Sequence, residues 1–306
     1  MMGEGVARLS PADKRRPLAR PRARTWWRGK RFQEYFWRGV ALLVVLLGAI
    51  AVLTPFMWMV STSLKSHMET YVFKWIPAKP MFSNFPKALT ALPFGRFFRN
   101  TSFITFAAMT GEVLSASAVA YGFARLRAPG REVLFLILLA TLMLPGQVTM
   151  IPMYLLYNKL GWVNTYRPLI VPAYFGGGAF SIFLLRQFFM TIPLEMDDAA
   201  KIDGCGFFQT YWRLILPLAR PALATIAIFS FMGNWNDFMG PLIYLNDWSK
   251  FTAALGLQFY SGSAQGSGNM ELMMAASLSA LLPCLILFFA AQRLFIQGIV
   301  ITGVKG

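Results

Sequence analysis

The side chains that most often carry out covalent chemistry or bind metals are few in this 306-residue sequence. They comprise one histidine, His67, and two cysteines, Cys205 and Cys284, which lie far apart along the chain. A metal site or a cysteine nucleophile needs further ligands or a base, so these residues predict neither. The phosphate-binding pattern G-x-x-x-x-G-K-[ST] does not occur. We therefore expect no catalytic residue, no metal site and no cofactor bound by this chain.

Polar residues that could bind a solute occur within or beside apolar stretches. Asn234, Trp235, Asn236 and Asp237 are consecutive, and Glu112 is an acid inside an apolar run. Amides and carboxylates hydrogen-bond to hydroxyl groups, and an indole face packs against the C–H surface of a sugar ring. These five residues are candidates for a substrate pathway. Two alternatives stay open: Asn236 and Asp237 cap a helix or bridge two helices, and Glu112 bonds a neighbouring helix or carries a proton.

The stretches that would position these residues are long and apolar. The sequence is 56% hydrophobic and only 14% charged, and residues 39–64, 133–158 and 272–292 contain no charge. Each run exceeds the roughly 20 residues that cross a bilayer core as a helix. We therefore predict an all-α polytopic membrane protein, in which residues 39–306 form one transmembrane domain. Its six expected transmembrane helices cover about 39–61, 101–124, 133–156, 168–189, 215–237 and 272–294.

The first 38 residues are basic, with 11 Lys or Arg against three acids. We expect residues 1–38 to form a disordered cytoplasmic tail that orients the chain and contacts anionic lipid. A nucleic-acid partner is disfavoured because a membrane span follows directly. With this tail inside, the inner segments hold 20 Lys or Arg and the outer segments hold nine. This excess predicts that both termini are cytoplasmic.

Residues 192–217, which we call the docking loop, have the pattern of a helix, a sharp turn and a second helix. Pro193 and the acids behind it favour a helix start, and Gly204 favours a left-handed helix end. Large aromatic side chains follow on the second helix. They could form a partner surface or lie against the ends of the spans, and composition leaves both open. The candidate partner-docking residues are Glu195, Asp197, Asp198, Ala199, Ala200, Asp203, Gly204, Phe207, Phe208 and Tyr211.

Three short segments of the docking loop resemble the EAA motif of ABC-importer permeases. They are Asp198-Ala199-Ala200, Gly204 and Ile215-Leu216-Pro217, in that order, with Asp198 where the motif has glutamate. In that family the motif forms a coupling helix, which docks into a cleft of the ATPase subunit. Four further segments resemble the carbohydrate, maltose-type branch of the family: FMWMVSTSLK, AYGFARLRAPGR, NWNDFMGPLIYL and QRLFIQGIVITGVKG.

The resemblance implies a type I ABC-importer permease fold and a permease subunit in a bacterial or archaeal cytoplasmic membrane. It implies alternating-access transport of a mono- or oligosaccharide, which an extracytoplasmic solute-binding protein delivers. The implied partners also include a second permease subunit and two ATP-binding subunits, which use ATP and Mg. Two alternatives remain: a permease for a non-sugar solute such as glycerol phosphate, and an ion-coupled secondary transporter.

Overall fold

The computed structural model describes residues 30–261 and 268–303, and every regular element in these ranges is helical. The chain divides after Met57 into two units, each described by itself. Helix α1, Lys30–Ser63, starts in the first unit, and its last residues, 58–63, belong to the second. Residues 30–38 are therefore helical and not disordered as expected, because no proline or glycine interrupts them and the apolar run continues their helix. The remainder of the expected tail, residues 1–29, lies outside the described residues.

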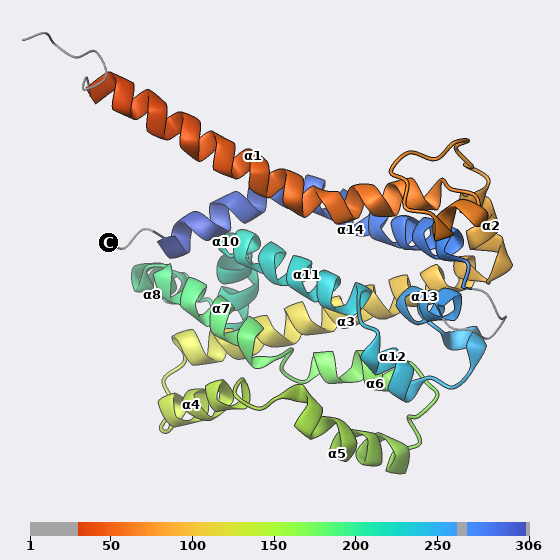
Figure 1. Ribbon diagram of the computed structural model, residues 1–306. Coiled ribbons are helices and arrows are strands. Elements are labelled where there is room, and N and C mark those ends of the chain that lie inside the picture. Colours follow the sequence, from red (N-terminus) through yellow and green to blue (C-terminus); the bar gives the residue numbers. More distant parts are fainter. Residues whose placement is uncertain (1–29, 262–267, 304–306) are drawn as a thin grey trace, which may run out of the picture. The chain divides into compact units, whose positions relative to one another are not determined.

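The second unit is organised around the long helix α3, Phe94–Arg125. Helices α7, Ala179–Thr191, and α11, Arg220–Trp235, lie alongside it (Figure 1). The surface of α3 that meets them carries small residues, among them Ala116 and Ala120, which are fully buried. Small side chains allow helix backbones to approach closely, which is how helices associate where water does not drive their packing.

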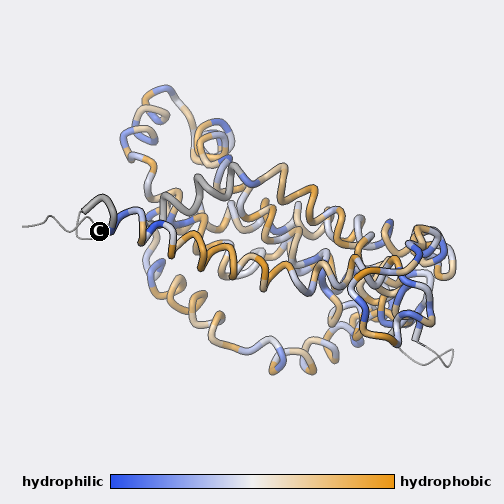
Figure 2. Tube along the Cα trace, turned by 45° about the horizontal axis from the view of Figure 1, so that its top comes forward, coloured by the Kyte–Doolittle hydropathy of each residue, from blue (hydrophilic) through white to orange (hydrophobic). Residues whose placement is uncertain are grey.

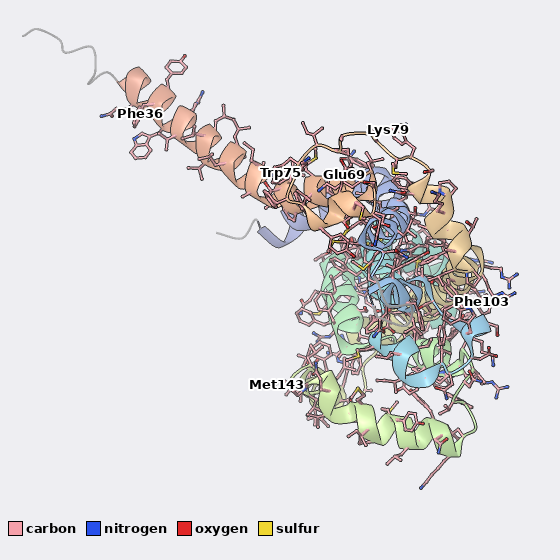
Figure 3. All side chains as sticks on the ribbon, turned by 45° about the vertical axis from the view of Figure 1, so that its right-hand side comes forward. Phe36, Glu69, Trp75, Lys79, Phe103 and Met143 are labelled. Atoms are coloured by element: carbon pink, nitrogen blue, oxygen red, sulfur yellow. The ribbon has the colours of Figure 1, made fainter. Side chains whose placement is uncertain are left out.

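Two of the six expected spans are bent. Helices α4, Arg131–Thr141, and α5, Gly146–Lys159, meet at 98° in place of one helix over 133–156. Pro145 is extended at the break, since its ring cannot continue the preceding turn. Met143, labelled in Figure 3, lies at this elbow. The hydropathy of this run predicted the apolar length correctly but not the bend.

The other bend lies at the start of the expected span 215–237. There the helical segment Phe207–Leu218 meets Arg220–Trp235 at 79°. Pro217 and Pro221 flank this break and account for it, because neither can donate a backbone hydrogen bond. The straight helix within the expected span, α11, therefore begins at Arg220, after the bend.

The fourth expected span is interrupted but stays on one course. It consists of α6, Arg167–Ile170, a 3-10 turn, Val171–Tyr174, and α7. Gly176, Gly177 and Gly178, all with positive φ, lie between the turn and α7.

The final helix is α14, Met270–Gly303. By length and composition the described residues hold four helices that could cross a membrane, or up to six when each bent pair counts as one span. Figure 2 shows hydrophobic colour along the long helices and hydrophilic colour mainly at their ends.

The segments expected on the outer side are folded. They contain short helices at α2, Asn84–Ala91, α12, Met239–Tyr244, and α13, Ala253–Ser261, besides 3-10 turns at 68–71 and 248–250. These elements bury an aromatic cluster that includes Phe94, Phe97 and Tyr260. This cluster packs the short helices α2 and α13 against the first turns of α3 and α14.

The loop before α2 closes around Glu69, which Figure 3 labels. Its carboxylate accepts hydrogen bonds from the Ser66 amide at 3.1 Å and the Ala78 amide at 3.0 Å. These two backbone bonds, that from Ala78 above all, hold the pKa of Glu69 below its usual range. Because the folded pKa is lowered, the ionised form stabilises the loop above the ordinary glutamate pKa, and that stabilisation is lost as pH falls through the folded pKa.

Glu69→Gln should loosen this loop, because a neutral amide accepts more weakly from both backbone N–H groups. Because the folded pKa of Glu69 is lowered, we expect the Ala78 amide of the wild-type chain to lose hydrogen-exchange protection between about pH 6 and about pH 2, after correction for intrinsic exchange rates. In the variant, protection should be low at both pH values. A wild-type Ala78 amide protected equally at both values would contradict the role given to the carboxylate.

Candidate docking loop and buried polar cluster

The docking loop, residues 192–217, begins with helix α8, Leu194–Ile202. Pro193 precedes the helix with an extended ψ of 139°, which sets the chain at its first turn. Glu195 and Asp197 lie in that turn, where the partial positive charge of the helix N-terminus favours acids. The start of the helix is therefore encoded locally, as the sequence predicted.

A tight turn ends α8. The Cys205 amide donates to the Ala200 carbonyl at 2.8 Å, and the Gly204 amide donates to the Lys201 carbonyl at 3.0 Å. This pair of bonds is the Schellman arrangement, which needs a left-handed residue just beyond the helix. Gly204 supplies it with φ +79°, so the predicted helix end is confirmed. The chain thus reverses through backbone bonds alone.

The second helix of the loop is α9, Phe207–Thr210, which continues through a π-helical turn, Tyr211–Ile215, into α10, Leu216–Leu218. Phe208 is 73% exposed, and Ile202, on the other side of the turn, is 87% exposed. Exposed apolar side chains among charges are typical of a partner surface. The candidate docking residues that lie exposed are Glu195, Asp198, Ala199, Asp203, Gly204, Phe207 and Phe208, while Ala200 is half-buried.

The two other candidates, Asp197 and Tyr211, point inward. Tyr211 is 5% exposed, and its hydroxyl lies 2.8 Å from the Ser117 hydroxyl on α3. Asp197 places a carboxylate oxygen 3.0 Å from the guanidinium of Arg125, at the end of α3. These two side chains hold the loop against α3 and do not present a surface to a partner.

Arg125 also binds the end of α7. One of its guanidinium nitrogens donates to the carbonyls of Phe189, at 2.8 Å, and Ile192, at 2.7 Å. Phe189 lies in the last turn of α7 and Ile192 caps it, at the end of the helix where carbonyls lack the regular helical donor. Arg125, the last residue of α3, therefore bonds carbonyls at the end of α7 and pairs with Asp197 in the first turn of α8.

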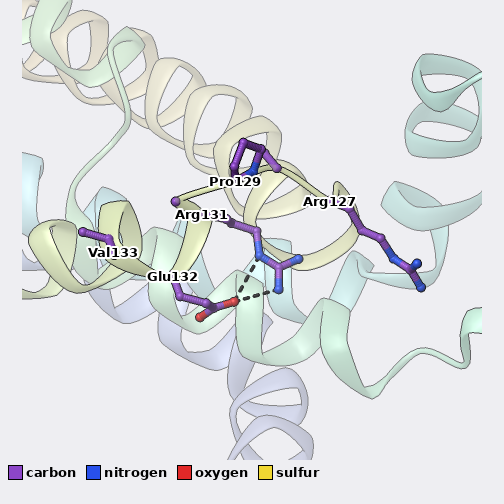
Figure 4. A pocket seen from close by; sticks show the side chains of 7 residues that line it. Arg127, Pro129, Arg131, Glu132 and Val133 are labelled. Carbon is purple, nitrogen blue, oxygen red and sulfur yellow. Dashed lines mark hydrogen bonds and ion pairs between the residues drawn. The ribbon is translucent and has the colours of Figure 1, made fainter.

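The turn between α3 and α4 carries an open pocket whose lining includes Arg127, Arg131 and Glu132 (Figure 4). Arg131 donates twice to one Glu132 oxygen, at 2.7 and 3.1 Å, and once to the Leu126 carbonyl at 3.0 Å. Arg186 of α7 approaches the other Glu132 oxygen at 3.3 Å. The pocket contains none of the candidate pathway residues, and its charges fix the turn to α7.

Glu112 lies in the middle of α3 and bonds two neighbouring helices. One carboxylate oxygen accepts from the Ser181 hydroxyl of α7 and the other from the Ser230 hydroxyl of α11, both at 2.6 Å. Asn234 donates to the Ser230 carbonyl at 2.8 Å, which fixes its amide orientation, and to the Ser230 hydroxyl at 3.3 Å. Because the Ser230 hydroxyl oxygen accepts from Asn234, its proton is donated to Glu112, so Asn234, Ser230 and Glu112 form a chain of hydrogen bonds that ends at the carboxylate.

The other candidate pathway residues make structural contacts. The Trp235 ring is buried against Phe231, with centroids 5.3 Å apart, and its Nε1 donates to a backbone carbonyl of α14 at 3.0 Å. Asn236 bonds its own helix. Asp237 accepts from the Gly240 amide at 3.1 Å and so caps α12. The structure therefore brings Glu112 and Asn234 together and shows the other three in helix contacts.

Sequence reasoning missed the residues that complete these clusters. Arg125 stood in a segment noted only for its resemblance, and Ser181 and Ser230 stood within apolar runs. A hydroxyl inside an apolar helix is itself a signal, because it bonds across helices where no water is available. The partner of each hydroxyl, by contrast, depends on packing that the sequence does not display.

Comparison with known proteins now bears on this arrangement. The model of the family described as binding-protein-dependent transport system inner membrane component matches residues 113–301, which include the docking loop, helices α7 and α11, and most of α14.

The chain belongs to this family.

Relatives of the permease support the same assignment. An arabinooligosaccharide transport permease of Halalkalibacterium halodurans is 34% identical over 247 residues, covering 80% of this chain and 86% of the relative. A melibiose, raffinose and stachyose import permease of Bacillus subtilis is 33% identical over 269 residues, covering 86% and 96%. An sn-glycerol-3-phosphate transport permease of Yersinia enterocolitica is 30% identical over 269 residues, covering 84% and 94%.

A solved structure shares the fold of the permease. It is a crystal structure of a bacterial ABC transporter involved in the import of the acidic polysaccharide alginate, with a TM-score of 0.75 at 24% identity. The match covers 85% of this chain and 97% of that one. The permease is therefore a membrane transport subunit and not an enzyme, and in such importers a separate subunit hydrolyses ATP.

Gly177 explains how the permease accommodates Glu112. A Cβ added to Gly177 would lie 2.7 Å from the Glu112 carbonyl oxygen and 2.9 Å from its Cγ. Its φ is +59°, a conformation that glycine adopts without steric cost. The interruption in the fourth span thus lets the backbone lie directly against the acid.

Gly177→Ala should destabilise the permease more than Gly161→Ala. Gly161 has a similar φ of +66°, but a Cβ there meets nothing within 4 Å. The control should cost about 1–2 kcal/mol for its left-handed backbone, and Gly177→Ala should cost about 1–3 kcal/mol more for the overlap. Thermal unfolding of the detergent-purified chain measures both. Equal losses would show that the close approach to Glu112 carries no cost.

Proposed function

We propose that this permease translocates a sugar delivered by an extracytoplasmic binding protein, by alternating access driven through the docking loop by a separate ATPase. The observation that carries the proposal is the construction of that loop. Its two helices are joined by a locally encoded turn and fixed to α3, while Phe207, Phe208 and Ile202 stay exposed. An element that is fixed to α3 and has an apolar outer surface suits docking into a groove of a partner.

The proposed assembly has a second permease subunit and two ATP-binding subunits, which use ATP and Mg. Its permease has six spans in the type I arrangement, with two of them bent. ATP binding would reorient the helices only if the docking loop interacts differently with the two states of the ATPase. The substrate pathway is proposed at Glu112 and Asn234, whose polar atoms meet among α3, α7 and α11.

Sugar is favoured as the solute for two reasons. The sequence resembles the carbohydrate branch over several segments, and relatives that cover most of the chain are named for oligosaccharides. A glycerol phosphate is the second candidate, since a relative of similar extent is named for it.

The proposed orientation has both termini and the docking loop in the cytoplasm, and the native cysteines test it. Cys205 lies half-exposed in the docking loop, whereas Cys284 is buried in α14. We expect a membrane-impermeant maleimide to label inside-out vesicles and to leave right-side-out vesicles unlabelled. Cys205→Ser should abolish the labelling, which assigns it to the loop. Labelling of Cys205 in right-side-out vesicles would contradict this orientation.

Phe208→Asp should release the ATPase and stop transport, because aromatic anchors carry much of the energy of such interfaces. We expect the amount of co-purified ATP-binding subunit to fall by about 10-fold or more. ATP-dependent uptake of radiolabelled arabino-oligosaccharide, raffinose and glycerol 3-phosphate by proteoliposomes is the second readout, and it also distinguishes the two solute classes.

Phe82→Asp is the matched control for this variant. Phe82 is 70% exposed, close to the value for Phe208, but lies in a segment expected on the outer side. This variant should retain the ATPase. Wild-type uptake and full ATPase retention by Phe208→Asp would refute docking through this loop, and uptake without ATP would favour an ion-coupled transporter.

A further inference from the structure

Three polar residues form a stripe along one face of α3, and each contacts the docking loop. Ser117, Tyr121 and Arg125 are spaced by four residues, so they lie on the same side of the helix. We propose that this stripe transmits the movement of the docking loop to the membrane helices, with Arg125 as its principal positioning residue. The proposal rests on the docking function above and names the residues through which that function acts.

The contact at Arg125 is desolvated. Its side chain is 4% exposed and that of Asp197 is 12% exposed, with the charged atoms 3.0 Å apart. Separating such a pair leaves two buried charges without compensation, so the pair holds the first turn of α8 firmly to the end of α3. The two carbonyls that Arg125 also binds fix the guanidinium itself.

The other two contacts secure the second helix of the loop. The Tyr121 hydroxyl donates to the Phe207 carbonyl at 3.2 Å, at the start of α9. The Ser117 and Tyr211 hydroxyls lie 2.8 Å apart at the start of the π-helical turn. Tyr121 and Tyr211 also pack ring to ring, with centroids 5.2 Å apart. Both helices of the docking loop are therefore attached to the same face of α3.

The covalent connection from the docking loop to the fifth span is less rigid than a continuous α-helix would be. It runs through the π-helical turn, past Pro217, and across the 79° bend into α11. A π-helical turn and a proline each interrupt the regular hydrogen bonding that keeps a helix stiff. A displacement of the loop is thus passed sideways into α3 more directly than along the chain.

Helix α3 then distributes the movement. Glu112 lies five residues before Ser117, about 7.5 Å along the axis, and bonds Ser181 of α7 and Ser230 of α11. One helix is therefore joined to the docking loop near its end and to two other helices at its middle. The stripe and Glu112 together connect the partner surface to the proposed pathway.

The test uses the assembled transporter, with ATPase subunits, second permease and binding protein. Asp197→Asn and Tyr121→Phe each weaken one contact, and the second deletes only a hydroxyl. Both should retain normal amounts of co-purified ATPase and normal basal hydrolysis. Stimulation of hydrolysis by the solute-loaded binding protein, and uptake, should fall about 2- to 30-fold. Arg125→Lys, which keeps the charge, should lose less than Arg125→Gln.

Arg131→Gln is the control, because Arg131 begins α4, six residues after Arg125, and its side chain bonds Leu126 and Glu132 and no docking-loop residue that the structure describes. It should behave as wild type. The double variant Arg125→Gln/Asp197→Asn should lose no more stimulation than Arg125→Gln alone.

Two outcomes would contradict the proposed role of the stripe. In the first, the binding protein stimulates ATP hydrolysis by the Asp197, Tyr121 and Arg125 variants as strongly as by Arg131→Gln. In the second, their losses of stimulation and uptake are no larger than the loss of assembled transporter. A wild-type chain that retains no ATPase would instead contradict the proposed function.

Discussion

A charge that leaves water must be compensated inside the protein, and this constraint fixes where the docking loop lies. Arg125 reaches the junction of three helices with its guanidinium almost fully buried. Asp197 supplies the opposite charge, and Phe189 and Ile192 at the end of α7 supply two carbonyl acceptors. Separating the ion pair would leave two desolvated charges, so this contact holds the docking loop against α3.

The same requirement operates in the middle of α3. Glu112 is surrounded by apolar helices, and its two oxygens are met by hydroxyls from α7 and α11. Those helices must approach closely to deliver a serine hydroxyl, and Gly177 removes the side chain that would prevent it. The broken fourth span and the half-buried acid are therefore linked: the interruption lets the chain pack against Glu112, and the Glu112 carboxylate bonds α7, which follows the interruption, and α11.

The sequence predicted the features that are encoded locally. The apolar runs, the helix start at Pro193 and the left-handed turn at Gly204 depend on neighbouring residues and were found where expected. The 98° angle at Pro145 was not predicted, because hydropathy measures apolar length and not direction. Asp197 and Tyr211 were grouped with the exposed residues of the loop, although they face inward. Their orientation depends on Arg125 and Ser117, which lie many residues away along the chain.

The docking loop inverts the usual distribution of side chains. An acid and a tyrosine hydroxyl are buried, while Phe207 and Phe208 are left exposed. Each choice is unfavourable for the isolated chain, since a buried charge is desolvated and exposed rings order water. The buried pairs offset the first cost by holding the loop in one conformation. The second cost is removed only when another surface covers the rings, and a preorganised loop then loses little conformational entropy on binding. The distribution is what a rigid element that works against a partner requires.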